Sequence, residues 1–423
     1  MYRWIVVVCM LAGALMTRAQ MNMGGPAGSM NENISRHMGA GTDLEPASSA
    51  PPMLMTMRPD GWMLMLHGEG SAVEQQQSGP RGHGKFFSVN WLMPMAQRNY
   101  GKNELTIRAM FSLEPATITG RFYPELFQEG ETAYGKPIVD GQHPHNLFME
   151  LAGLYDRKVG SHALLSLYAA PVGDPALGPE AFPHRASIGD DPLAPLGHHL
   201  EDSTHIADEV LTGGVTWSAG QRGLRVEASG FHGREPGENR WIIAVGAVDT
   251  WSARLSVAPG KDWSGQYSLG HLHSPESAQP AENVLRQTAS VTYHHVTGLG
   301  ELNAIGVWGR NHTSGTPIDA NGYLFEAALR PKDKQTVWTR IENADRTTDL
   351  LGALAPPMES VVGRVQAYTG GYAHRVWGWQ DGSAELGAQF TAYGVPDRLL
   401  PYYGQHPFGV AAVLEFRLGK GER

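Results

Sequence analysis

Apolar and polar residues alternate along most of this chain, from about residue 62 to residue 418. In the segment 385–392, for example, Leu386 and Phe390 fall on one face of an extended backbone, whereas Glu385 and Gln389 fall on the other. A period of two residues is that of a β-strand, because successive side chains of a strand point to opposite faces. The alternation therefore predicts an all-β chain. Further segments with the same alternation are 223–230, 251–257, 263–269, 288–293 and 410–418.

The connections between these segments are short and long in turn. The short ones are rich in Gly, Lys, Asn or Pro and cover 99–103, 157–161, 219–222, 259–261, 297–300 and 331–334. The long ones cover 77–85, 115–144, 173–205, 235–246, 274–285, 312–320, 346–361 and 395–407. This alternation is typical of bacterial outer-membrane barrels, in which the turns are periplasmic and the loops external. The sequence thus predicts a transmembrane antiparallel β-barrel over residues 59–423, with about 16 strands (range roughly 12–18) and both termini in the periplasm.

A water-soluble β-sandwich or propeller is the alternative that alternation by itself leaves open. A propeller would repeat itself about every 40–50 residues, and the sequence shows no such self-similarity. The positions of the tryptophans favour a membrane barrel over a soluble fold, because aromatic rings gather where strands meet the bilayer surface. The tryptophans near expected strand ends are Trp62, Trp91, Trp217, Trp241, Trp251, Trp263, Trp377 and Trp379.

The first residues have the layout of an export signal. Arg3 precedes an apolar stretch over residues 5–16, and the small residue Ala19 follows. A positive end, a short apolar core and a small cleavage residue are typical of a secretory signal peptide, which we expect over residues 1–19. The only cysteine, Cys9, lies within it.

Composition limits the remaining possibilities. Residues 20–58 are rich in Gly, Met, Pro, Ser and Ala without periodicity, so we expect a disordered Met-rich tail in the periplasm. The net charge of −9 argues against nucleic acid as a partner. The mean hydropathy of −0.29 excludes a helical membrane protein, but it is compatible with strands that turn every second residue toward a polar lumen.

Methionine is distributed unevenly, since all but one of the 17 methionines lie at or before Met149. If Trp62 faces lipid, then Met63, Met65 and His67 follow one another on the lumen face of the same strand. Thioether sulfur is a soft ligand that selects Cu(I). These three residues are therefore candidate copper ligands that continue the Met-rich tail, with simple filling of the barrel interior as the alternative.

Histidine is concentrated between residues 143 and 205, in two motifs placed where the longest loops meet strands. Imidazole together with carboxylate suits zinc, copper(II) or iron. On this topology the motifs can converge at the outer mouth or fold inward, and the sequence leaves open whether they meet. A polar loop network without a metal is the alternative. Their candidate ligands are Asp140, His143, His145, His198, His199, Asp202 and His205.

Catalytic motifs are weak in this chain. Ser203 lies beside Asp202 and His205 but has no Gly-x-Ser-x-Gly elbow around it. The sequence contains neither a Gly-rich phosphate loop nor a His-Glu-x-x-His motif. We therefore expect that the protein is not an enzyme, and a barrel-embedded hydrolase is kept only as a second alternative.

With its signal peptide, Met-rich tail and antiparallel barrel, the chain resembles outer-membrane proteins of the copper-resistance protein B type in architecture. The phrases GQHPHNLFMELAGLYD and APLGHHLEDSTHIADEV also resemble those of an uncharacterised group of bacterial exported proteins. The first resemblance implies an outer-membrane barrel that handles copper, and it assigns no functional residue.

The leading prediction is thus an outer-membrane barrel that binds or passes a soft metal ion, most simply copper. A general diffusion porin, in which loops 115–144 and 173–205 constrict the pore, is the first alternative. The partners expected are outer-membrane lipid and a metal ion or small solute, with association into homo-oligomers left open.

Overall fold

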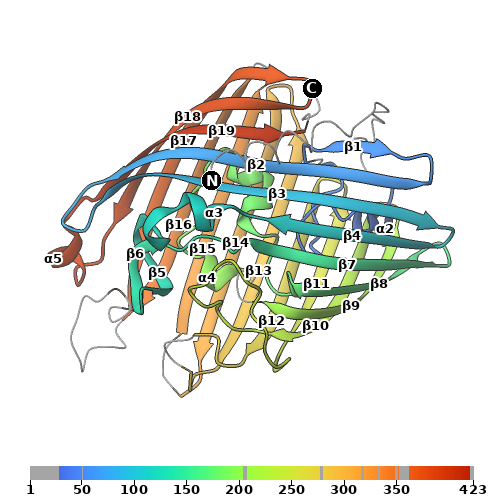
Figure 1. The fold of residues 1–423 in the computed structure, drawn as a ribbon, viewed down its shortest axis with the longest axis horizontal. Helices are drawn as coiled ribbons and strands as arrows, with labels where there is room; N and C mark the ends of the chain where they lie inside the picture. The colour runs from blue at the N-terminus through green and yellow to red at the C-terminus, as the bar shows by residue number, and fades with distance from the viewer. Residues whose placement is uncertain are drawn as a thin grey trace.

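The computed structural model describes residues 28–49, 51–202, 207–276, 280–315, 319–331, 334–347, 351 and 362–419. The expected signal peptide, residues 1–19, lies outside the described residues. Sixteen antiparallel strands form a closed barrel, which confirms the predicted fold class (Figure 1). The barrel strands are β2 (Trp62–Gln77), β3 (Gly84–Tyr100), β4 (Asn103–Phe111), β7 (Phe148–Val159), β8 (Ala163–Val172), β9 (Asp208–Ala219), β10 (Arg222–His232), β11 (Thr250–Gly260), β12 (Trp263–Leu272), β13 (Val284–Val296), β14 (Gly300–Thr313), β15 (Asp319–Pro331), β16 (Gln335–Thr347), β17 (Val362–Trp379), β18 (Gly382–Gly394) and β19 (Phe408–Leu418).

The barrel closes where its last strand meets its first. β19 pairs with β2 and ends with Leu418 opposite Gly68. A short extra strand, β1 (Leu54–Met57), then pairs with the next stretch of β2, with Leu54 opposite Leu66. β1 thus covers the edge of β2 that β19 is too short to reach, so the backbone groups of β2 are paired along both sides.

The predicted alternation of short and long connections is confirmed. The short turns gather at one end of the barrel and the long loops at the other, where helix α5 (Leu400–Tyr403) lies (Figure 1). In the short turns, Gly160 and Gly220 each have a φ of 62°, a left-handed conformation that glycine adopts without steric cost. We call these two ends the short-turn end and the long-loop end.

The strands turn their apolar side chains outward and their polar side chains inward. On β10, Leu224 and Val226 are 47% and 53% exposed, whereas Arg225 and Glu227 between them are buried. Opposite charges inside the wall are paired: the Arg225 Nε atom lies 2.9 Å from a Glu227 carboxylate oxygen. This polarity is the inverse of that in a water-soluble protein and is the pattern of a barrel surrounded by lipid. None of the described helices is both long and apolar enough to cross a bilayer.

Part of the segment expected to be disordered is ordered inside the barrel. Residues 28–49, which we call the N-terminal plug, include helix α2 (Met30–Arg36), capped at its start by the Ser29 hydroxyl. The plug lies at the short-turn end, where Met30 packs against Leu164 of β8. Composition could not reveal this order, because the partners that hold the plug are supplied by the barrel wall. The region 20–58 thus departs from the expected disorder over residues 28–49 and in β1.

One side chain on the inner face of the barrel wall holds the plug in place. Arg108 of β4 donates hydrogen bonds to the backbone carbonyls of His37, Gly39 and Gly41, at 3.0, 2.5 and 2.5 Å. The same guanidinium pairs with both carboxylate oxygens of Glu150, at 2.6 and 2.8 Å. A buried charge is tolerated only when it is paired and hydrogen-bonded, and here the plug supplies part of that satisfaction.

Two long loops fold inward from the long-loop end. The entrance loop, residues 112–147, contains α3 (Glu114–Thr117), η1 (Thr119–Arg121) and a hairpin of β5 (Tyr123–Ala133) and β6 (Lys136–Gln142). The inner loop, residues 173–202, contains η2 (Phe182–His184), η3 (Ala186–Ile188) and α4 (His198–Glu201). Figure 1 shows α4 inside the wall, beside β13 and β15.

Candidate functional site

The inner loop packs against the far wall because two paired glycines leave room for it. Gly309 of β14 and Gly322 of β15 lie opposite each other in the sheet. A Cβ atom on Gly309 would lie 2.2 Å from the Leu200 carbonyl oxygen, and one on Gly322 would lie 3.4 Å from the Leu200 Cβ atom. The backbone of α4 therefore rests directly on the strands, which fixes the position of the residues that this helix carries.

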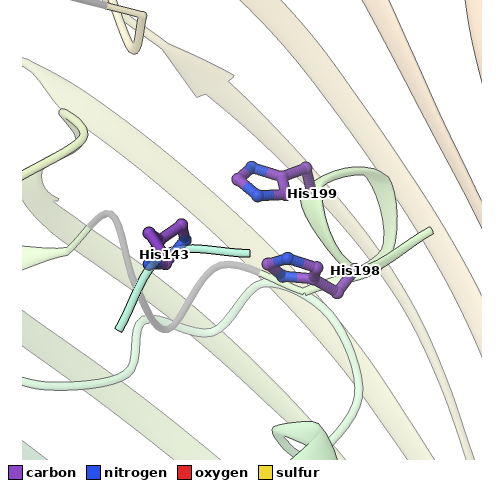
Figure 2. A group of neighbouring side chains, drawn as sticks. All are labelled: His143, His198 and His199. Carbon is purple, nitrogen blue, oxygen red and sulfur yellow. The ribbon is translucent and has the colours of Figure 1, made fainter. Parts of the chain in front are cut away.

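Helix α4 and the strand-end of the entrance loop bring three histidines together. Figure 2 shows His198 and His199 extending from the same helical turn toward His143, which follows β6. One ring nitrogen from each of the three lies within 4.8 Å of the others. The ring centroids of His198 and His199 are 4.0 Å apart, and that of His143 is 6.2 and 5.8 Å from them. We call this group the three-histidine cluster.

The surroundings of the cluster orient its rings. The Nδ1 atom of His143 lies 3.1 Å from the Pro144 carbonyl oxygen, and its Nε2 atom lies 3.1 Å from the Glu131 carboxylate. The Nε2 atom of His198 lies 3.1 Å from the Gln142 side-chain oxygen. A hydrogen bond from one ring nitrogen to an oxygen atom fixes the tautomer and the orientation of an imidazole and leaves its other nitrogen for a metal. At His143 the nitrogen left for a metal is Nε2, which faces the Glu131 carboxylate.

The entrance loop also makes space for the third ring. A Cβ atom on Gly130 would lie only 2.9 Å from the His199 ring, so glycine at this position lets the β5 backbone approach it. Zinc or copper holds imidazole nitrogens at about 2.0–2.1 Å, which places neighbouring nitrogens roughly 3.3 Å apart. The nitrogens of the cluster lie within 4.8 Å of one another, so the three residues form a candidate metal site.

Three other predicted ligands of the two histidine motifs, Asp140, His145 and Asp202, do not belong to this cluster. Asp140 accepts hydrogen bonds from Arg81 and from the backbone of Phe127. His145 faces Glu114, with its Nδ1 atom 2.8 Å from the carboxylate. The backbone carbonyl of Asp202 accepts a hydrogen bond from Arg286. His205 lies outside the described residues, as does Ser203 of the hydrolase alternative.

The predicted ligands of the first strand lie in a separate group. Met65 and His67 are buried inside the wall, and Met63 is partly buried beside them. They do not join the three-histidine cluster, which is built from the long loops. The structure instead surrounds them with residues that the sequence analysis did not single out as ligands, namely Trp91, Met93, Met95, Met110 and His184.

Two of these residues, Met93 and Met95, could have been found from the sequence. Met93 and Met95 alternate on β3 as Met63 and Met65 do on β2, and antiparallel pairing of neighbouring strands places such residues side by side. His184 could not be found in this way, because it comes from the inner loop. Burial, reinforced by the nearby His67 ring and Arg108, holds the pKa of His184 well below its ordinary value.

Comparisons with known proteins give a fold and no family. No family model matches the chain, and no curated protein matches its sequence. Among solved structures, Salmonella typhi OmpF in complex with daunomycin is 7% identical over 86% of this chain and 100% of its own, with a TM-score of 0.50. An anion-selective porin from Comamonas acidovorans is 11% identical over 84% and 99%, with a TM-score of 0.47. The channel DcaP of Acinetobacter baumannii is 9% identical over 85% and 99%, with a TM-score of 0.45. At 7% identity the likeness to OmpF establishes the fold alone, and the chain is a porin-like antiparallel β-barrel.

Proposed function

We propose that this protein is an outer-membrane channel for small solutes in which the inner loop constricts the lumen. The lipid-facing apolar surface and the porin-like fold support the location. The observation that carries the proposal is that the inner loop is bonded to the wall on the opposite side of the barrel from the strands that it connects.

The centre of these bonds is Arg340 of β16. Its guanidinium donates to the Leu193 carbonyl at 3.0 Å and lies 3.2 Å from the Asp191 carboxylate, both on the inner loop. It also donates to Glu326 of β15 at 3.1 Å, and Glu326 in turn accepts a hydrogen bond from Ser187. Hydrogen bonds that involve charged groups each contribute about 1.5–3 kcal/mol, so this network holds the loop across the lumen.

The attachment continues around the barrel. Gln389 of β18 donates to Asp191 at 2.9 Å, and Arg417 of β19 donates to Asp190 at 3.0 Å. On the other side, Ser268 of β12 accepts a hydrogen bond from the Gly178 amide at 2.8 Å. The inner loop therefore spans the lumen rather than lining one side of it. Solute passage then depends on movement of this loop.

A reversible cross-link tests this dependence. A Cβ atom on Gly322 would lie 3.4 Å from the Leu200 Cβ atom, near the short end of the range of about 3.5–4.5 Å that disulfides use. Leu200→Cys with Gly322→Cys, in a chain whose only cysteine is removed by Cys9→Ser, should tether α4 to the wall when oxidised. The refolded protein is placed in a planar lipid bilayer and its conductance is recorded before and after reduction.

We expect low conductance in the oxidised form and recovery when the disulfide is reduced. The reduced double variant and each single-cysteine variant are the controls. Equal conductance in the oxidised and reduced forms would refute constriction by the inner loop. Absence of conductance in the unmodified protein at every voltage would refute the channel itself.

The three-histidine cluster supports a second candidate function, binding of a divalent transition metal at the constriction. Calorimetric titration of the refolded protein with Zn(II) and Cu(II) tests it. His198→Ala should lower the affinity by roughly tenfold or more, whereas His162→Ala, at the short-turn end, should not change it. Unchanged affinity in His198→Ala would exclude the cluster as the binding site.

A further inference from the structure

A second group of metal-ligand side chains lies apart from the three-histidine cluster, on the inner wall formed by β2, β3 and β4. We call it the methionine cluster. Its buried members are Met53, Met65, Met93, Met95 and Met110, and Met38, Met55, Met63, Met149 and Trp91 pack around them. Methionine is a flexible filler of irregular cores, so packing alone would explain an apolar group of this kind. It does not explain the two histidines that enter it.

The strand register places the first histidine among the sulfur atoms. His67 of β2 lies directly opposite Met93 of β3, and Met65 lies opposite Met95. Residues opposite each other in an antiparallel pair have Cβ atoms about 4.5–5.5 Å apart. His67 and Met93 are both buried, at 3% and 0% exposure.

The second histidine arrives from the inner loop. The Nε2 atom of His184 lies 3.2 Å from the Met110 sulfur. The ring centroids of His184 and His67 are 5.6 Å apart, and the indole of Trp91 lies 4.4 and 4.9 Å from them. Three neighbouring strands and one loop thus present two imidazoles, two thioethers and an aromatic ring to the same place.

One atom of this group lacks a hydrogen-bond partner. Within the described part of the chain, the Nε2 atom of His67 is buried and makes no hydrogen bond. A buried polar atom left unsatisfied costs about 1–3 kcal/mol. Its surroundings are sulfur and aromatic carbon, so a metal ion would satisfy it where a water molecule would find few partners.

We propose that the methionine cluster binds one soft monovalent metal ion, Cu(I) or Ag(I), through His184, Met110, His67 and Met93. Thioether sulfur is a soft ligand that selects Cu(I) over hard cations such as magnesium or calcium. All four ligands are neutral, and the cost of burying an ion grows with the square of its charge, which favours a monovalent ion here. The face of Trp91 adds attraction for a cation. The guanidinium of Arg108, on β4, adds little net charge because Glu150 pairs with it.

A small cavity gives the ion access to these ligands. Its volume is about 50 Å³, and its lining includes Met110, His184, Met149, His143 and His145. It therefore borders both the methionine cluster and the three-histidine cluster. The proposal goes beyond the channel and stands whether or not the inner loop moves.

The test is anaerobic titration of the refolded full chain with Cu(I) against a chromogenic Cu(I) chelator, repeated with Ag(I) because silver has no redox chemistry under these conditions. The variants are Met110→Leu, Met93→Leu and His184→Gln. Leucine conserves the volume of methionine and costs less than about 1.5 kcal/mol in a core. Met57→Leu is the matched control, because Met57 is 40% exposed at the end of β1.

We expect one Cu(I) or Ag(I) ion per chain and a loss of affinity of at least roughly tenfold in each of the three variants, since even residues that only support a ligand contribute that much. Met57→Leu should bind as the unmodified protein does. Circular dichroism and heat-dependent gel mobility establish that each variant is folded as a barrel.

Either of two patterns in the variants, or an unmodified protein that binds no Cu(I), would overturn the proposal. One pattern is that folded Met110→Leu and His184→Gln bind Cu(I) as tightly as the unmodified protein. The other is that binding is lost in His198→Ala while Met110→Leu retains it, which would place the ion at the three-histidine cluster. Conductance is measured separately, so failure of the channel proposal and failure of this one are distinguishable.

Discussion

Gly309→Ala is expected to release the inner loop from the wall. A Cβ atom at this position would lie 2.2 Å from the carbonyl oxygen of Leu200 and 3.0 Å from the Cα atom of Glu201. An ordinary contact needs about 3.4 Å or more, so α4 has to move by about 1.2 Å or the strand has to yield. β14 is hydrogen-bonded on both sides along its length, whereas α4 is one turn of helix in a loop. We therefore expect α4 to move.

The magnitude follows from the cost of overpacking, which is about 1–3 kcal/mol for an extra methyl group in a filled site. Since about 1.4 kcal/mol corresponds to a factor of ten in an equilibrium, the undocked form of the inner loop should become roughly 5- to 150-fold more populated. The lumen would open more often, and the three-histidine cluster would lose its alignment.

The measurement is single-channel conductance and open probability, together with Zn(II) affinity. Gly306→Ala on the same strand is the control, because a Cβ atom there meets nothing within 4 Å. We expect a higher open probability and weaker Zn(II) binding in Gly309→Ala only. If Gly309→Ala behaves like Gly306→Ala in both measurements, α4 does not rest on β14 as described and the reasoning fails.

Two further predictions concern the plug and the entrance loop. Arg108→Ala removes three hydrogen bonds to the plug and leaves Glu150 buried without its charged partner, so the barrel should lose about 3–5 kcal/mol of stability and the plug should become protease-sensitive. The double variant Arg108→Met with Glu150→Gln should regain stability, but its plug should stay protease-sensitive. A plug that resists protease in Arg108→Ala would contradict the role of Arg108 in holding it. Burial, reinforced by Glu342, raises the pKa of Glu125 in β5 well above its ordinary value. A carboxyl group whose pKa is higher in the folded state than in the unfolded state destabilises the fold as pH rises above its unfolded pKa, which is 4.5 here. Glu125→Gln should therefore protect the β5–β6 hairpin against hydrogen exchange at pH 8 and differ little from the unmodified chain at pH 4; equal exchange at pH 8 would contradict a raised pKa.

The strands could be predicted because each is a local pattern. The segment 385–392 alternates along its own length, and the structure turns Leu386 and Phe390 outward and Glu385 and Gln389 inward, as expected. The short and long connections were equally visible, because glycine and loop length are read directly from the sequence. The plug escaped prediction, because a segment of low complexity acquires its order from Arg108 and the lumen wall rather than from its own periodicity.

The candidate sites were also predictable from the sequence only in part. The predicted pairs His143 with His145 and His198 with His199 placed histidines in the right loops, but only three of these four meet. His145 turns to Glu114 instead. Met65 and His67 were expected on the lumen face, and they are buried there. Their partner His184 could not be chosen among the other histidines without the path of the inner loop.

The sequence by itself determined the class of fold and the polarity of each face, because a two-residue period and the chemistry of turns act between neighbouring residues. Only the tertiary structure decided where the long loops go once the barrel has closed. That choice depends on complementarity across the lumen: glycines at 309 and 322 that admit α4, Arg340 that bonds Asp191 and Leu193, and Met110 that meets His184. These pairs are far apart in the chain, so no local pattern encodes them.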